Sequence, residues 1–105
     1  MAINDNSTSE SSLVVSGVTG NAPTTLKVGV NIVHTYRGDL VISLVAPDGS
    51  VYLLEDFPNN DSTANVNKTY TVNASSEVAN GTWKLRVQDV ASQDTGKIDA
   101  WNLTF

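Results

Sequence analysis

The sequence predicts an all-β fold, an antiparallel β-sandwich formed by a single domain. Apolar and polar residues alternate with a period of two in several segments, and clusters of Gly, Pro, Asn and Asp separate these segments. No long window shows the spacing of an amphipathic helix. The length of 105 residues fits one hydrophobic core and leaves no room for two. Together these observations favour a sandwich.

The expected strands follow one another in chain order. Residues 1–12 are polar and rich in Asn and Ser, so we expect a linker or loosely held entry segment there and the sandwich within 13–105. Strands are expected at 13–18, 26–33, 40–46, 51–54, 67–72, 81–88 and 97–105. The run Pro47-Asp48-Gly49-Ser50 is a β-turn signature, and it predicts that 40–46 and 51–54 form a hairpin.

Alternation is clearest in four of these segments, and it changes phase in the last. Apolar residues occupy alternate positions in Leu26 to Ile32, Leu40 to Leu44, Tyr70 to Val72 and Trp83 to Val87. In 97–105, Ile98 and Ala100 share one phase, whereas Trp101, Leu103 and Phe105 share the other. One extra residue would explain this change, so we expect a β-bulge between Asp99 and Trp101.

Composition excludes several classes of function. Eleven acidic and six basic residues give a formal charge of −5, which would repel nucleic acid and anionic membranes, and no apolar run approaches the length needed to span a bilayer. Cysteine is absent and histidine occurs once, so a metal would have to be held by oxygen ligands. The N-terminus has no export signal, and we expect any such signal to lie outside these residues.

Two catalytic arrangements are weighed against the sequence. Asp94-Thr95-Gly96 is the tripeptide of aspartic proteases, and a homodimer would place two such carboxyl groups together. Only nine residues follow Gly96 and no apolar strand leads into Asp94, so this is a remote alternative. A Ser-His-Asp site is also disfavoured, because the sequence contains no G-x-S-x-G motif beside which His34 could act.

The histidine and the two tryptophans are expected to be structural. His34 stands at the end of a predicted strand, where its ring is expected to join a strand end and a loop. Trp83 and Trp101 lie in phase with apolar neighbours, which predicts core positions. The alternative for the tryptophans is a platform on which a carbohydrate stacks.

Antiparallel strands sort the connecting loops between two ends of a sandwich. If the predicted strands alternate in direction, 34–39, 55–66 and 89–96 share one pole with the N-terminal segment, and most carboxylates gather there. Oxygen-rich loops of this kind suit Ca²⁺. The candidate ligands are Asp39, Asp56, Asp61 and Asp94, with Asp89 as an alternative and Asn59, Asn60 or Asn65 supplying neutral oxygens. The alternative is a solvated acidic surface.

Several runs taken together resemble the P domain of proprotein convertases, in the form found in bacterial secreted proteases. They are His34 to Leu40, Ala46 to Ser50, Gly81 to Leu85, Asp89, Asp94 to Gly96 and Trp101 to Leu103. The resemblance implies a jelly-roll-like sandwich with no peptidase site of its own. It also implies a catalytic protease domain in cis, N-terminal to this chain, and a role in folding, stability or engagement of a protein substrate.

The sequence therefore favours a non-catalytic accessory domain of a secreted bacterial protease, with a serine endopeptidase as the expected parent. We expect a monomer that works outside the cell, with calcium as its cofactor. The alternative from a different class is a free-standing β-sandwich module that binds carbohydrate or protein.

Overall fold

The structure, a computed structural model, describes residues 2–3, 8–34, 38, 40–57, 63–89 and 96–105. It contains eight strands: β1 (Ala2–Ile3), β2 (Thr8–Val15), β3 (Leu26–His34), β4 (Leu40–Val45), β5 (Val51–Asp56), β6 (Val66–Val72), β7 (Gly81–Asp89) and β8 (Gly96–Thr104). Every pairing between them is antiparallel, and the described residues form no α-helix. Accordingly, the described part of the chain offers no helix that could span a membrane.

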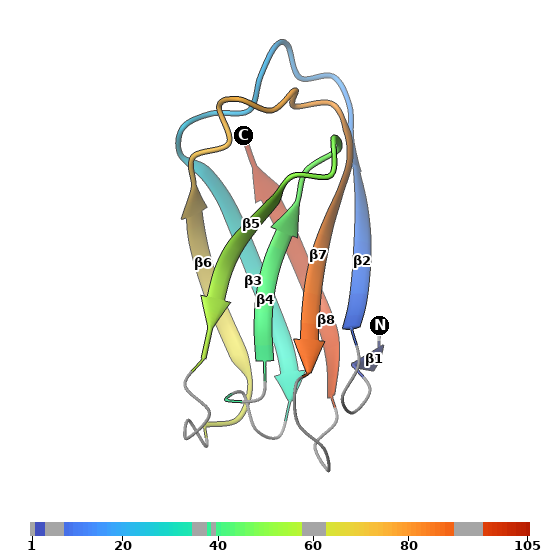
Figure 1. Cartoon of the computed structure of the whole chain (residues 1–105), viewed down its shortest axis with the longest axis vertical. Helices are drawn as coiled ribbons and strands as arrows, with labels where there is room; N and C mark the ends of the chain where they lie inside the picture. The colour runs from blue at the N-terminus through green and yellow to red at the C-terminus, as the bar shows by residue number, and fades with distance from the viewer. Residues whose placement is uncertain (1, 4–7, 35–37, 39, 58–62, 90–95) are drawn as a thin grey trace.

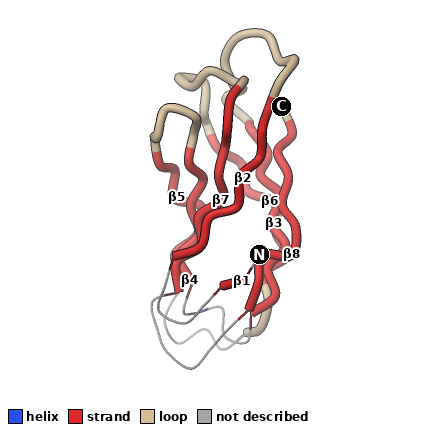
Figure 2. Tube along the Cα trace, turned by 90° about the vertical axis from the view of Figure 1, so that its right-hand side faces the viewer, coloured by secondary structure: helices blue, strands red, loops and turns tan. Residues whose placement is uncertain are grey.

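The strands form two facing four-stranded sheets (Figures 1 and 2). Sheet A has the order β1-β8-β3-β6, and sheet B has the order β2-β7-β4-β5. The predicted all-β sandwich is confirmed. In β3 the alternation holds along the whole strand, since Leu26, Val28, Val30 and Ile32 are all buried between the sheets. Burial of these alternating side chains supplies the main driving force for stacking the two sheets.

The predicted hairpin joins β4 and β5. The backbone N–H of Ala46 donates to the carbonyl of Ser50 at 2.8 Å, and the Asp48 carboxylate accepts from the N–H of Ser50 at 2.9 Å. This second bond is the local contact that makes Asp a favoured turn residue. The turn therefore forms where the sequence places it.

The predicted bulge in β8 is also present. Asn31 of β3 faces Ala100, but the next residue, Ile32, faces Ile98. Asp99 is thus the extra residue, and it shifts the phase of the strand so that Ile98 and Trp101 both turn toward the core.

The sandwich starts earlier in the chain than expected. Strand β2 begins at Thr8 and pairs with β7 along its whole length, although Thr8 to Ser12 carry no apolar side chain. Before it, Ile3 pairs with Gly96 and is 1% exposed. Our expectation of a linker over 1–12 was therefore wrong for these strands. Backbone hydrogen bonds at a sheet edge do not require apolar side chains, so hydropathy gives no signal of them.

Strand direction sorts the strand ends as predicted. The ends of β3, β5 and β7 and the starts of β4, β6 and β8 lie together at the lower end of the molecule in Figure 1. We call this end the lower pole. The hairpin turn and the segments 16–25 and 73–80 lie at the opposite end, the upper pole.

The two tryptophans differ in burial. Trp83 is fully buried, and its Nε1–H donates to the carbonyl of Ala79 at 2.9 Å. Trp101 is only partly buried, and its Nε1–H reaches Ser11 of the opposite sheet at 3.1 Å. Among the described residues, β1 pairs with β8 only at Gly96 and Lys97, so no described strand covers the edge of β8 beside Trp101. Trp83 fulfils the core prediction, whereas Trp101 does so only in part.

Candidate functional site

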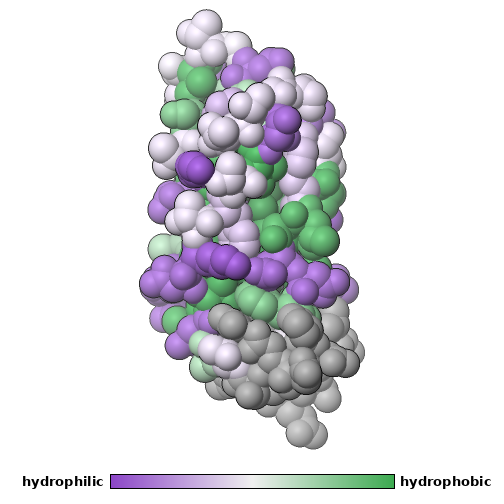
Figure 3. Space-filling view, turned by 90° about the vertical axis from the view of Figure 1, so that its left-hand side faces the viewer, coloured by the Kyte–Doolittle hydropathy of each residue, from purple (hydrophilic) through white to green (hydrophobic). Residues whose placement is uncertain are grey.

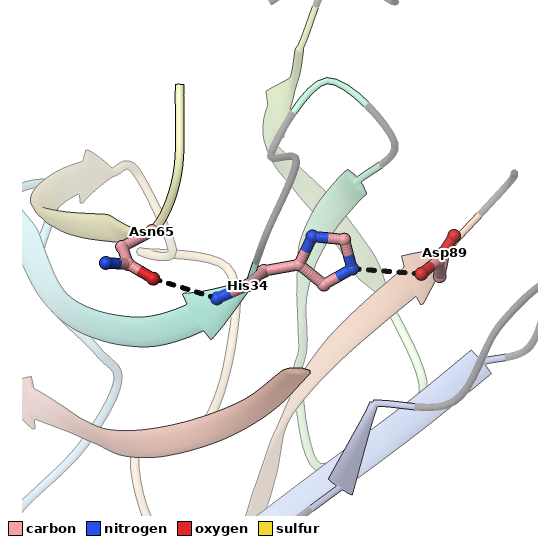
Figure 4. A network of polar contacts seen from close by, with 3 residues as sticks. All are labelled: His34, Asn65 and Asp89. Atoms are coloured by element: carbon pink, nitrogen blue, oxygen red, sulfur yellow. Dashed lines mark hydrogen bonds and ion pairs between the residues drawn. The ribbon is translucent and has the colours of Figure 1, made fainter. Parts of the chain in front are cut away.

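The lower pole is built around a buried pair formed by His34 and Asp89 (Figure 4). Nε2 of His34 lies 3.0 Å from Oδ2 of Asp89, and both side chains are 0% exposed. His34 ends β3 in sheet A, whereas Asp89 ends β7 in sheet B. The pair therefore bridges the two sheets at the lower pole, where Asp56 also ends its strand.

Asn65 holds the main chain of His34 from the other side. Its Oδ1 accepts from the N–H of His34 at 3.0 Å, and its own N–H donates to the His34 carbonyl at 2.9 Å. Asn65 has a φ of 67°, in the left-handed region that Asn tolerates better than most residues. This conformation lets one residue make both bonds, and it fixes the entry to β6 against the end of β3.

Gly96 completes this arrangement by packing its backbone directly on β3. A Cβ atom at Gly96 would lie 2.0 Å from the carbonyl oxygen of Val33 and 2.8 Å from Cα of His34. No other residue fits there without moving a backbone segment. His34 thus has close contacts with β7, β8 and the entry to β6.

The geometry assigns the His34–Asp89 pair a structural role. Neither side chain has an exposed surface at which a substrate could meet the imidazole. A buried, hydrogen-bonded pair of this kind holds two strand ends in register, and the removal of one member leaves the other desolvated. This agrees with the expected structural role of His34.

The phase of the strands contains a signal that our sequence analysis missed. His34 is in phase with Ile32, and Asp89 is in phase with Val87, so both residues point between the sheets. Two polar residues at inward positions of strands that end at the same pole are expected to meet, because neither can remain unpaired when buried.

The described candidate calcium ligands differ in burial and in their hydrogen bonds. Asp89 is buried, and its Oδ2 is paired with Nε2 of His34. Asp56 ends β5 at the lower pole with an exposed side chain. Asn65 is exposed, but its Oδ1 is bonded to the His34 backbone. Among the described residues, no three His, Cys, Asp or Glu side chains gather as a metal site.

The other candidates from the sequence lie outside the described residues. These are Asp39, Asp61, Asp94, Asn59 and Asn60. Of the tripeptide Asp94-Thr95-Gly96, on which the aspartic-protease alternative depends, only Gly96 lies within the described residues.

A polar seam closes one open side of the sandwich above the lower pole. Nζ of Lys68 lies 3.1 Å from Oε1 of Glu55 and 5.4 Å from the ring centre of Tyr70, and the Tyr70 hydroxyl is 3.4 Å from the same Glu55 oxygen. The three residues link β5 of sheet B to β6 of sheet A. Figure 3, which views this side, shows hydrophilic side chains in a band across its lower half. Such half-exposed contacts contribute little energy, but they cover the edge between the sheets.

A second polar cluster lies at the upper pole. Glu77 is 4% exposed and accepts a short hydrogen bond from the hydroxyl of Tyr52, which raises the pKa of Tyr52. The N–H of Ser50 and, secondarily, a hydrogen bond with Glu77 lower the pKa of Asp48. A cavity of about 300 Å³ opens beside Asp48 and Glu77, between Pro47 and Val78. The cluster ties the hairpin turn and β5 to the segment before β7.

The sequence and the fold are both similar to those of known proteins. Residues 23–105 match the family model described as the proprotein convertase P-domain. The chain is 65% identical over 95 residues to leupeptin-inactivating enzyme 1 of Streptomyces exfoliatus, covering 90% of this chain and 22% of that protein. It is 56% identical over 105 residues to the transglutaminase-activating metalloprotease of Streptomyces mobaraensis, covering 100% of this chain and 14% of that protein.

More distant proteins share the same region. The chain is 34% identical to a calcium-dependent protease of Nostoc sp., covering 91% of this chain and 16% of that protein. A serine protease of Aeromonas sobria, solved in complex with its chaperone, superposes with a TM-score of 0.68 at 25% identity, over 97% of this chain and 24% of that one. The chain thus spans less than a quarter of each of these proteins.

Proposed function

Because the chain belongs to the proprotein convertase P-domain family, we propose that it is the non-catalytic accessory domain of a secreted protease, joined in cis to the catalytic domain. One observation carries this proposal: the chain corresponds to only 14% to 22% of its two most similar relatives described above, one of which is a metalloprotease. The remaining length of those relatives is available for a catalytic domain, which we place N-terminal to this chain.

The buried state of the one histidine supports the non-catalytic assignment. The imidazole of His34 is enclosed with Asp89, so it is not available as a general base to a substrate in solution. We expect the purified chain to leave casein intact between about pH 4 and pH 8, roughly the range in which carboxyl and imidazole groups act as catalysts. Casein hydrolysis that disappears in Asp94→Asn would overturn this assignment and favour the aspartic-protease alternative.

We propose that the domain supports the folding and stability of its attached catalytic domain. Trp83→Ala, which leaves a cavity in the core, should therefore reduce the yield of secreted active protease when it is introduced into the full-length protein. The matched control is Val14→Ala on β2, because the side chain of Val14 is 75% exposed. Equal yields of active protease from both variants would contradict the supporting role.

We also propose a catalytic class for the parent protease, namely a serine endopeptidase. The serine protease of Aeromonas sobria supports the serine endopeptidase expected from the sequence, whereas the metalloprotease of Streptomyces mobaraensis supports a metal-dependent parent. Inhibition of the full-length enzyme by a serine-directed sulfonyl fluoride, with no effect of a zinc chelator, would establish the serine class. The opposite pattern of inhibition would overturn it.

We further propose that Ca²⁺ stabilises the lower pole. The relative named a calcium-dependent protease and the exposed carboxylate of Asp56 support this proposal. An ion that binds only the folded state adds about 2.7 kcal/mol when its concentration is a hundredfold above Kd. The melting temperature should fall in EGTA and recover with Ca²⁺ more than with equal Mg²⁺ at constant ionic strength. An unchanged melting curve would leave the lower pole as a solvated acidic surface.

A further inference from the structure

The outer face of sheet A carries a shallow groove of about 280 Å³ that crosses β6, β3 and β8. We call it the amide groove. Its outward-pointing residues are Gly29, Asn31, Asn67, Thr69, Ala100 and Asn102. Three of these six residues carry carboxamides, and none of the six is aromatic or charged.

Strand register brings the groove residues together in two adjacent rows. In one row Asn67, Asn31 and Ala100 lie side by side across the three strands. In the next row Thr69, Gly29 and Asn102 do the same. Adjacent strands are separated by about 4.8 Å, so the three amides lie within reach of a single extended segment.

Gly29 shapes the floor of the groove. A Cβ atom at this position would lie 2.6 Å from Oδ1 and 2.9 Å from Nδ2 of Asn102, so the Asn102 amide lies over the bare backbone of β3. Gly in the interior of a strand is unfavourable for the sheet itself, and it commonly marks a place where a ligand or another backbone approaches closely.

Amides in the groove are open to a ligand. Asn67 and Asn102 are exposed, and their side chains make no hydrogen bond with any described residue. Nδ2 of Asn31 makes only a long contact, 3.5 Å, to Asp99. Each carboxamide offers one acceptor and two donors. A matching ligand is therefore neutral and presents donors and acceptors at short intervals.

The peptide group has this chemistry, and an extended chain repeats it about every 3.3 Å. A sugar ring would instead be favoured by an aromatic face. Trp83 is buried, and Trp101 is directed across the sandwich to Ser11, so neither lies on this face. Lys68, which also borders the groove, has its ammonium group paired with Glu55.

We propose that the amide groove binds an extended, uncharged segment of a protein substrate. This inference rests on the proposed function, because it is the attached protease that gives the bound segment its use. Since the groove is neutral, binding should depend little on salt concentration. The domain would hold the substrate chain near the catalytic domain through backbone amides, with little preference for side chains.

Titration of the chain with gelatin, a soluble and extended polypeptide, tests the proposal. Side-chain amide signals of Asn31, Asn67 and Asn102 should shift in ¹H–¹⁵N spectra, together with the backbone amide of Gly29. Asn102→Ala should weaken binding by about threefold to tenfold, as expected for one lost hydrogen bond. Thr82→Ala, an exposed strand residue on sheet B, is the matched control and should bind as the wild type does.

A second variant and a second ligand keep the test decisive. Gly29→Ala should displace the Asn102 amide and abolish binding, while signals outside the groove stay in place. Dextran should cause no shift, and shifts of the same amides with dextran would assign the groove to carbohydrate instead. Gelatin shifts elsewhere, an absence of shifts, or an Asn102→Ala variant that binds normally would each overturn the proposal.

Kinetics of the full-length enzyme separate this inference from the proposed function. Asn102→Ala should raise KM for gelatin and leave kcat and the hydrolysis of a short peptide unchanged. If KM is unchanged while Trp83→Ala still lowers the yield of active protease, the groove assignment fails and the supporting role stands. If neither variant has an effect, both proposals fail.

Discussion

Asp89→Ala is the substitution that best separates a structural role at the lower pole from a metal-binding role. It would remove the Asp89 carboxylate from the His34 ring, and the side chains of both residues are 0% exposed in the native protein. Breaking a buried pair in this way costs about 3–5 kcal/mol, out of the 5–15 kcal/mol typical of a small domain. Asp89→Asn retains an acceptor oxygen and loses only the charge, so its cost should be smaller, about 1–2 kcal/mol.

Thermal melting in EGTA and in Ca²⁺ gives the measurement. For a domain of this size, 1 kcal/mol corresponds to about 4–8 °C in Tm, so Asp89→Ala should melt at least about 12 °C lower than the wild type. Asp99→Ala is the matched control, because the side chain of Asp99 is half-exposed and its contact with Lys97 is long, at 3.8 Å. That variant should stay within about 0.5 kcal/mol of the wild type.

The calcium response decides between the two roles. If Asp89 braces the sheets, Asp89→Asn should lower stability in EGTA and still gain stability from Ca²⁺. Loss of the calcium response in Asp89→Asn, with stability in EGTA unchanged, would refute the brace and restore Asp89 as a ligand. In a double-mutant cycle, adding His34→Ala to Asp89→Ala should cause only a small further loss of stability, because the two residues act as a pair.

Three further predictions concern the core, the upper pole and the entry to β6. Trp83→Ala should lower the free energy of unfolding in urea by about 3–5 kcal/mol, and acrylamide should quench Trp83 only after denaturation; Val14→Ala should change stability by less than about 0.5 kcal/mol. Tyr52→Phe should cost about 1–3 kcal/mol at pH 7, because the Glu77 carboxyl group is left buried without its donor. Since folding raises the pKa of Tyr52, its contribution is complete below the ordinary tyrosine pKa of about 10 and is lost as pH rises above that value, so the variant should lose less stability at high pH than the wild type. Asn65→Ala should destabilise more than Asn65→Gly, by about 1–2 kcal/mol, because only Gly tolerates the φ of 67° without strain; equal losses would show that the amide alone matters.

Alternation in the sequence was sufficient for most of the sandwich. Strand β3, the hairpin at Pro47 to Ser50 and the bulge at Asp99 follow from residue types alone. Each depends on contacts between chain neighbours or on the two-residue period of a strand, and both can be recognised from residues that are close together in the sequence. The N-terminal strands were missed for the same reason. Residues 8–12 pair through their backbone, and local hydropathy contains no record of that pairing.

The contacts of the candidate site could be predicted from the sequence only in part. Strand parity gathers Asp89 and Asp56 at one pole, and the sequence determines that much. The phase of β3 and β7 directs His34 and Asp89 between the sheets, but only the stacking of the two sheets sets the distance of 3.0 Å between them, while Asp56 stays in solvent. The same holds for the seam between Glu55 and Lys68. Each of these contacts joins residues on different sheets, and the distance across a sandwich depends on how all the core side chains pack, which no segment of the sequence specifies by itself.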